Sequence, residues 1–130
     1  MRDKGFTLIE LVIVVSIVVI LASIAVPSYF RAMERVKSKE ARTTLEAMNA
    51  AEKSYNAERR IYIGLASGVD TDWASIGLDN PNNNADRAFS YMLTPVGAGF
   101  IATATRRNGP NNGETITITD DDTWGGNWSP

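Results

Sequence analysis

The chain has 130 residues and a formal net charge of −2, from 13 Lys or Arg and 15 Asp or Glu residues. It contains no cysteine and no histidine. These counts exclude disulfide frameworks, cysteine zinc sites, thiol nucleophiles and imidazole bases. The length predicts a single domain. The mildly acidic net charge argues against nucleic-acid binding over the whole surface.

An uncharged apolar run lies near the N-terminus. Leu11–Phe30 covers twenty residues without one charge. At ~1.5 Å per helical residue such a run spans roughly 30 Å, the thickness of the hydrocarbon core of a bilayer. The run therefore predicts a membrane-spanning helix that carries a polar head. Charge is segregated in the rest of the chain, with a net +3 over residues 31–60 and a net −5 over residues 61–130.

The helical signal continues beyond the apolar run. Residues 31–58 contain no Gly or Pro and are rich in strong helix formers. We expect one helix from Phe6 to about Glu58, apolar all round in its first half and amphipathic in its second. Pro27 removes the hydrogen bond to the Ser23 carbonyl, which predicts a kink there. The expected buried face, spaced by three and four residues, is Ala41, Leu45, Met48, Ala51 and Tyr55.

The remainder of the chain has the pattern of a small sheet. Residues 61–87 hold glycines and the cluster DNPNNN, which predict an irregular connection. Strand-like runs follow at residues 88–94, 99–107 and 114–120, separated by turn residues. Alternation in the second run places Phe100, Ala102 and Ala104 on one face, which is expected to pack on the helix. We therefore predict an α+β fold, with a three-stranded antiparallel meander packed on the C-terminal half of the helix. The tail of residues 120–130, with two tryptophans, is expected to pack on the head without a defined position.

The first ten residues, MRDKGFTLIE, hold the most specific motif. Glu10 lies inside the apolar region, where a carboxylate costs at least a few kcal/mol. No Lys or Arg lies between Phe6 and Phe30 to pair with it. The segment resembles the type III signal peptide of type IV pilins and the related pseudopilins, specifically over residues 4 to about 30.

The resemblance implies a processing pathway and a division of the chain. A membrane-embedded prepilin peptidase and methyltransferase is expected to cut between Gly5 and Phe6 and to methylate the Phe6 amine. Glu10 is implied as an assembly determinant. The pilin-like fold then divides into a removed leader (1–5), an apolar filament-core half of the helix (6–30), an amphipathic half (31–60) and a globular head (61–130).

Cleavage supplies a counter-charge for Glu10. Before cleavage the Phe6 nitrogen belongs to a neutral amide, and afterwards it is an ammonium. This ammonium can pair with Glu10 of the same helix, four residues on, or with Glu10 of a neighbouring subunit. We therefore hypothesise that removal of the leader switches on the contact that recruits the next subunit.

The expected function is structural rather than enzymatic, and no cofactor is predicted. The resemblance implies a type IV pilus subunit that supports adhesion, motility or DNA uptake. Implied partners are further copies in a helical homopolymer, the processing peptidase, an inner-membrane assembly platform and, before assembly, membrane lipid; the monomer is not expected to bind nucleic acid. The precursor would cross the inner membrane with its head in the periplasm, and the filament would lie at the cell surface.

The sequence also allows three other interpretations. One is the major pseudopilin of a type II secretion system, which also lacks cysteines. Another is a single-pass anchor for a periplasmic domain that does not polymerise. An ordinary secretory signal cut after Ala25 is disfavoured by Glu10 in the apolar region and by Pro27 just beyond the cut.

Three consecutive aspartates near the C-terminus, Asp120, Asp121 and Asp122, offer oxygen ligands of the kind that calcium prefers. The alternating spacing of known calcium loops is absent, however. A solvated turn is the favoured interpretation, and no metal site is predicted.

Overall fold

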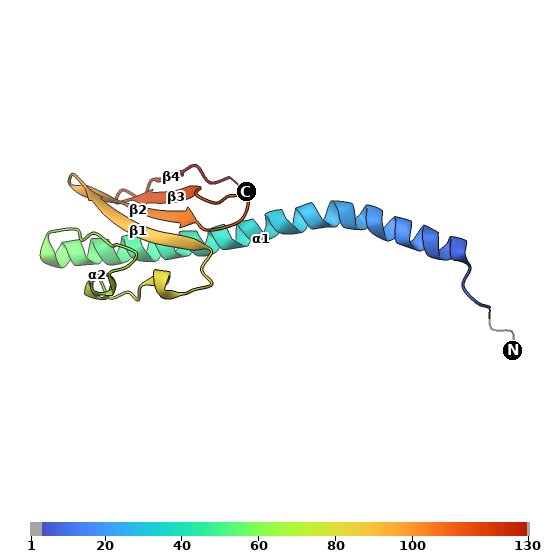
Figure 1. Ribbon diagram of the computed structural model, residues 1–130. Coiled ribbons are helices and arrows are strands. Elements are labelled where there is room, and N and C mark those ends of the chain that lie inside the picture. Colours follow the sequence, from blue (N-terminus) through green and yellow to red (C-terminus); the bar gives the residue numbers. More distant parts are fainter. Residues whose placement is uncertain (1–3, 130) are drawn as a thin grey trace. The chain divides into compact units, whose positions relative to one another are not determined.

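The computed structural model describes residues 4–129, so residues 1–3 of the expected leader lie outside the described part. The chain divides into two compact units, Met1–Arg35 and Val36–Pro130. Helix α1 (Leu8–Arg59) contributes residues to both (Figure 1). Its bounds agree with the helix expected from Phe6 to about Glu58.

In the N-terminal unit, α1 continues through Pro27 without interruption. Every large apolar side chain between Leu8 and Phe30 is exposed. The helix is long and apolar enough to cross a membrane, by length and composition. Two of its hydroxyl groups bond to the helix itself, since Ser16 Oγ donates to the Val12 carbonyl at 2.7 Å and Ser23 Oγ donates to that of Ile20 at 2.6 Å. A kink at Pro27 stays a prediction.

The C-terminal unit contains a four-stranded antiparallel sheet in the order β1-β2-β3-β4 (Figure 1). The three predicted strands are confirmed, but the predicted strand count was wrong by one. The C-terminal tail adds a short fourth strand beside β3. This fourth strand has only three residues, and two of them are glycines, which have low strand propensity. The pairing with β3 therefore defines the strand. The strands are β1 (Phe89–Val96), β2 (Gly99–Arg106), β3 (Thr115–Thr119) and β4 (Trp124–Gly126).

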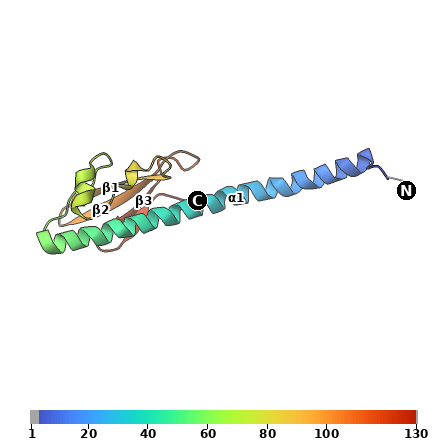
Figure 2. The same ribbon diagram turned by 90° about the horizontal axis from the view of Figure 1, so that it is seen from below.

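The core lies between one face of this sheet and the second part of α1, over which the strands lie in both views (Figures 1 and 2). Alternate residues of β2 face it, and Phe100, Ala102 and Ala104 are buried as predicted. Two alanines at 0% exposure in the middle strand leave room for the helix to pack closely. The other buried apolar residues of the strands are Phe89, Tyr91, Leu93, Ile116 and Ile118.

The buried face of α1 differs in part from the predicted one. Ala41, Leu45 and Met48 are buried as expected, and Ala51 and Tyr55 are only half-buried. The next fully buried position is instead Glu52, at 0% exposure. Sequence periodicity placed the charged residues of the helix away from this face. This placement was wrong for Glu52, because the segment that follows the helix folds back over it, and Glu34 is buried as well, at 8% exposure.

The connection between α1 and β1 is more regular than predicted. It contains a short helix α2 (Asp70–Ser75) and a 3₁₀ turn η1 (Pro81–Asn83). Trp73 of α2 is fully buried in the core. Its indole Nε1 donates to the Ala66 carbonyl at 2.9 Å, so its one polar group is satisfied.

The same connection covers the outer edge of β1. The Asn82 side chain accepts from Tyr91 N at 2.8 Å and donates to Tyr91 O at 2.9 Å, as a neighbouring strand would. Leu65 exchanges two backbone hydrogen bonds with Leu93, at 2.9 and 3.0 Å. The exposed backbone of an edge strand can pair with another chain. The contacts at Tyr91 and Leu93 occupy backbone groups of β1 that would otherwise be open to such pairing.

Candidate functional site

The first turn of α1 is closed by a reciprocal capping box. Thr7 N donates to Glu10 Oε2 at 2.9 Å, and Glu10 N donates to Thr7 Oγ1 at 3.3 Å. Thr7 Oγ1 also donates to the same carboxylate oxygen at 2.8 Å. The first four N–H groups of a helix lack partners within it, and this arrangement closes the helix start with side-chain and backbone bonds.

Sequence reasoning missed this use of Glu10. The spacing Thr7-x-x-Glu10, directly before an apolar run, is the signal that predicts a capping box. The interpretation that Glu10 lacks any partner before cleavage is therefore incomplete. Its partners are neutral groups, however, which leave the charge of an ionised carboxylate without a counter-ion.

Gly5 and Phe6 lie just outside the helix. Residues 4–7 adopt no regular secondary structure, and Phe6 is 79% exposed. Nothing lies within 4 Å of the position that a Cβ of Gly5 would take. The peptide bond between these residues is thus on open, non-helical backbone, the conformation in which chains are most readily cleaved.

The capping box also brings Glu10 toward the position of the expected new terminus. Glu10 Oε2 lies 2.9 Å from Thr7 N, and Thr7 directly follows Phe6. A negative charge is favoured at this end of a helix, because the partial positive charges of the free N–H groups lie there. An ammonium on Phe6 would therefore form beside an already positioned acceptor.

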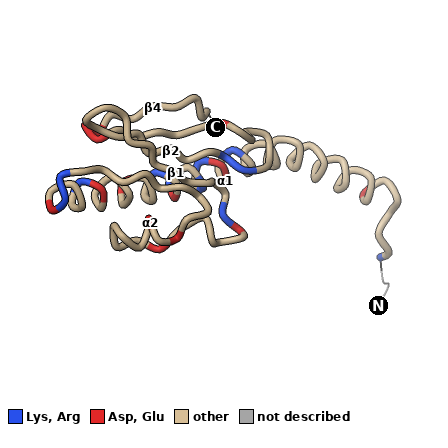
Figure 3. Tube along the Cα trace, turned by 60° about the vertical axis from the view of Figure 1, so that its left-hand side comes forward, with Lys and Arg blue, Asp and Glu red and all other residues tan. Residues whose placement is uncertain are grey.

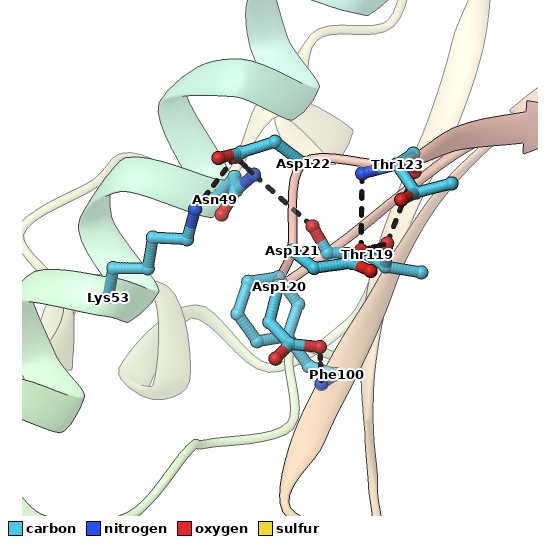
Figure 4. Close-up of polar contacts among 8 residues, drawn as sticks. All are labelled: Asn49, Lys53, Phe100, Thr119, Asp120, Asp121, Asp122 and Thr123. Carbon is cyan, nitrogen blue, oxygen red and sulfur yellow. Dashed lines mark hydrogen bonds and ion pairs between the residues drawn. The ribbon is translucent and has the colours of Figure 1, made fainter.

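The three C-terminal aspartates are turned to three different sets of partners (Figure 4). Asp120 Oδ1 accepts from Phe100 N at 3.3 Å. Asp121 Oδ1 accepts from the Thr119 hydroxyl and from Thr123 N, within the β3–β4 turn. Across residues 4–129, no group of three or more His, Cys, Asp or Glu side chains is gathered as a metal site.

Asp122 joins this turn to helix α1. Its Oδ1 accepts from Lys53 Nζ at 2.7 Å and from Asn49 Nδ2 at 2.8 Å. These donors, Lys53 first, hold the pKa of the Asp122 carboxyl below its ordinary value. The hydroxyl of Thr119, followed by donors of Thr123, does the same for the pKa of Asp121. The aspartates thus fasten the turn that carries β4.

Charged residues are distributed unevenly over the chain. Figure 3 shows the first part of α1 almost entirely without charge, whereas basic and acidic positions are frequent on its remainder and on the head. The apolar segment and the capping box therefore form one continuous candidate site for membrane insertion and helix packing.

Known proteins share the motif at this site. Residues 1–26 match the family described as the prokaryotic N-terminal methylation motif. The type IV major pilin protein PilA of Myxococcus xanthus strain DK1622 is 46% identical over 68 residues, which are 52% of this chain and 31% of the relative. A fimbrial protein of Pseudomonas aeruginosa is 40% identical over 71 residues, 55% of this chain and 46% of the relative.

A more extended match includes the head. A fimbrial protein of Dichelobacter nodosus is 31% identical over 117 residues, 90% of this chain and 66% of the relative. The alignments with these relatives therefore span between 31% and 66% of the relatives' length. No solved structure matches the chain. The methylation motif lies at the start of α1, and an α+β head follows it in the sequence. Together with the similarity to pilin and fimbrial proteins, this shows that the chain belongs to the type IV pilin and pseudopilin family.

Proposed function

We propose that this chain is a structural subunit of a type IV pilus, which polymerises through α1 after cleavage between Gly5 and Phe6. The observation that carries the proposal is the exposed apolar surface of α1 between Leu8 and Phe30, preceded directly by the Thr7–Glu10 capping box. A helix that is apolar all round needs lipid or other helices around it.

The same surface suits two successive environments. In a precursor, the apolar segment would span the inner membrane and hold the head in the periplasm. In a filament, the segments of many copies would pack on one another and exclude water. Val, Ile, Leu and Ala serve both states, so extraction from the membrane exchanges lipid contacts for helix contacts of similar polarity.

Cleavage would convert the capping box into an assembly contact. The ammonium on Phe6 offers Glu10 a counter-ion, which the neutral groups of Thr7 do not supply, and an ion pair in an apolar surrounding avoids the cost of an uncompensated buried charge. Methylation of Phe6 keeps the positive charge. If the ammonium pairs with Glu10 of a neighbour, the pair also sets the axial register between two subunits.

The proposed partners follow from this pathway. They are the prepilin peptidase and methyltransferase, an inner-membrane assembly platform, membrane lipid before assembly, and further copies of this chain in the filament. The named relatives are major pilin and fimbrial proteins, which favours a surface pilus over the pseudopilus of a secretion system. Adhesion, motility and DNA uptake are the roles that such a filament would support.

The test separates the charge of Glu10 from its capping role. Glu10→Gln keeps an oxygen that accepts from Thr7 N but removes the charge, whereas Thr7→Ala removes the hydroxyl and keeps the charge. Fibres sheared from cells carrying each variant are analysed by mass spectrometry, with exposed Glu46→Gln as the matched control. We expect a processed, membrane-held Glu10→Gln chain that enters few fibres, and near-normal fibres for Thr7→Ala and Glu46→Gln.

Two results would overturn the proposal. Fibres from Glu10→Gln cells as abundant as the wild type would refute the charge pair. Wild-type cells in which the chain occurs as isolated molecules that retain Gly5, or that are cut after Ala25, would refute a polymerising subunit and favour a simple membrane anchor.

A further inference from the structure

Glu52 of α1 is an acid in the core that the helix forms with the head, outside the membrane-spanning segment. It is fully buried between α1 and the segment that follows the helix. Its Oε2 accepts from Ile63 N at 3.2 Å. Its Oε1 has no hydrogen-bond partner among the residues that the structure describes. Burial raises the pKa of this carboxyl to about 7, with the Ile63 N–H acting in the opposite direction.

A second unsatisfied oxygen lies one helical turn earlier. Asn49 is 3% exposed, and its Nδ2 donates to Asp122 Oδ1 at 2.8 Å and to Thr119 O at 3.4 Å. Both of these partners are acceptors, so the orientation of the amide is determined. Its Oδ1 is left buried and without a partner within residues 4–129.

The two unsatisfied atoms are both acceptors on the same buried face of α1. Residues three apart on a helix are neighbours, with about 5–6 Å between their Cβ atoms. Two acceptors repel each other when the Glu52 carboxyl is ionised, and each buried acceptor that lacks a donor destabilises the fold. One proton on the Glu52 carboxyl turns one acceptor into a donor and satisfies both atoms together.

We propose that Glu52 is a neutral acid in the folded head and that its Oε1–H donates to Asn49 Oδ1, forming a proton-held link. The link runs from Ile63 N–H to the Glu52 carboxyl, then to the Asn49 amide, and from there to Asp122 and the Thr119 carbonyl. It connects the segment after α1 with the β3–β4 turn through the helix between them.

The surrounding charged groups are engaged elsewhere or point to solvent. Lys53, the nearest cation in sequence, pairs with Asp122 at 2.7 Å. The Tyr62 ring packs on Phe100, with centroids 4.9 Å apart. The burial of Glu52, and not a neighbouring charge, is the first cause of its raised pKa. Further titratable groups on the elements around this link are Glu46, Glu58, Arg59 and Arg60, all exposed, and the half-buried Tyr55. Asp120 and Asp121 bond within the sheet and its turn.

The link makes the head sensitive to pH near neutrality. Below about pH 7 the proton is present and the link is closed. As the pH rises through this value, the ionised carboxylate loses its contact with Asn49 and retains only the Ile63 N–H. This inference concerns the head alone, so it stands whether or not the chain polymerises.

Nuclear magnetic resonance of the full-length chain in detergent micelles tests the link. The ¹³C signal of the Glu52 carboxyl is followed from pH 4 to 9 together with the ¹⁵N and ¹H signals of the Asn49 side-chain amide. We expect a Glu52 midpoint near 7, and Asn49 signals that move with that same midpoint. A Glu52 midpoint near the ordinary 4.5, or Asn49 signals that do not respond at the Glu52 midpoint, would overturn the proposal.

A variant separates the hydrogen bond from burial. Asn49→Leu keeps the site apolar but removes the acceptor, so the proton affinity of Glu52 should fall about tenfold, one pKa unit. If burial alone were responsible, the midpoint would stay or rise in this variant, and the link would be refuted. Exposed Glu46→Gln is the control, and its Glu52 midpoint should match the wild type. The wild-type titration decides the question on its own if Asn49→Leu fails to fold.

Discussion

Replacement of Glu52 by Gln should stabilise the head at alkaline pH. The Gln side chain has the shape of a protonated Glu, with an oxygen that accepts from Ile63 N and an N–H₂ that donates to Asn49 Oδ1. It cannot ionise. The variant therefore copies the protonated state of Glu52 at every pH, without loss of volume in the core.

The expected size follows from the raised pKa. In the unfolded chain the carboxyl has its ordinary pKa of 4.5, and in the folded head the pKa is about 7. Between these values the folded state binds more protons, so the free energy of unfolding falls as the pH rises. Stability is fully present below 4.5, is lost progressively up to about 7, and is constant above. At 1.36 kcal/mol per pKa unit, the loss is about 3 kcal/mol.

Equilibrium urea unfolding in non-ionic detergent at pH 4, 6 and 8 measures this difference. All three tryptophans lie in the head, and fully buried Trp73 reports its unfolding by fluorescence. Glu52→Gln should match the wild type at pH 4 and exceed its stability by about 3 kcal/mol at pH 8. Other titrating groups are common to both chains and cancel in the comparison.

The control is Glu46→Gln, which removes an exposed carboxylate from the same helix. It should leave the stability within about 0.5 kcal/mol of the wild type at each pH. The reasoning is refuted if Glu52→Gln and the wild type show the same pH dependence. It is also refuted if Glu52→Gln is less stable at pH 8, because the carboxylate charge itself would then be stabilising.

Two further substitutions test the packing of the head by the same urea assay, and a third tests strand β4 by hydrogen exchange. Asn82→Ala removes both side-chain bonds to the β1 backbone and should cost about 2–4 kcal/mol, with exposed Asn83→Ala near neutral; equal effects would contradict the edge role. Leu45→Ala at 0% exposure should cost about 2–5 kcal/mol, and a loss below 1 would show a looser core. Gly126 has a φ of 104°, and the Thr115 carbonyl lies where a Cβ would go, so Gly126→Ala should detach β4 from β3 and speed hydrogen exchange of the β4 amides. Gly68→Ala, where a Cβ meets open space, should leave this exchange unchanged.

Local patterns were sufficient for much of the architecture. The alternation in residues 99–107 predicted that Phe100 faces the core, and the structure confirms it. The spacing of Leu45 and Met48 likewise predicted the part of α1 that the sheet covers. The Thr7–Glu10 capping box is also encoded locally, because a Thr three residues before a Glu directly precedes the apolar run.

Other features depend on segments far apart in the chain. Asn82 lies in a run that reads as a turn, yet its amide serves as the pairing partner of β1. The aspartates of the run 120–122 have similar neighbours in sequence but receive donors from β2, their own turn and α1, respectively. Which donor each side chain meets depends on register and loop geometry, which composition does not encode.

The sequence by itself determined the length of the apolar helix, the motif at Gly5, Phe6 and Glu10, and three of the strands. Such features repeat over a few residues, so propensity and periodicity define them. Only the tertiary structure decided that β4 pairs with β3 and that Glu52 lies in the core. The same carboxyl would be an ordinary solvated acid on an isolated helix. It becomes a buried proton carrier because a segment eleven residues further on, at Ile63, closes over it and removes the water.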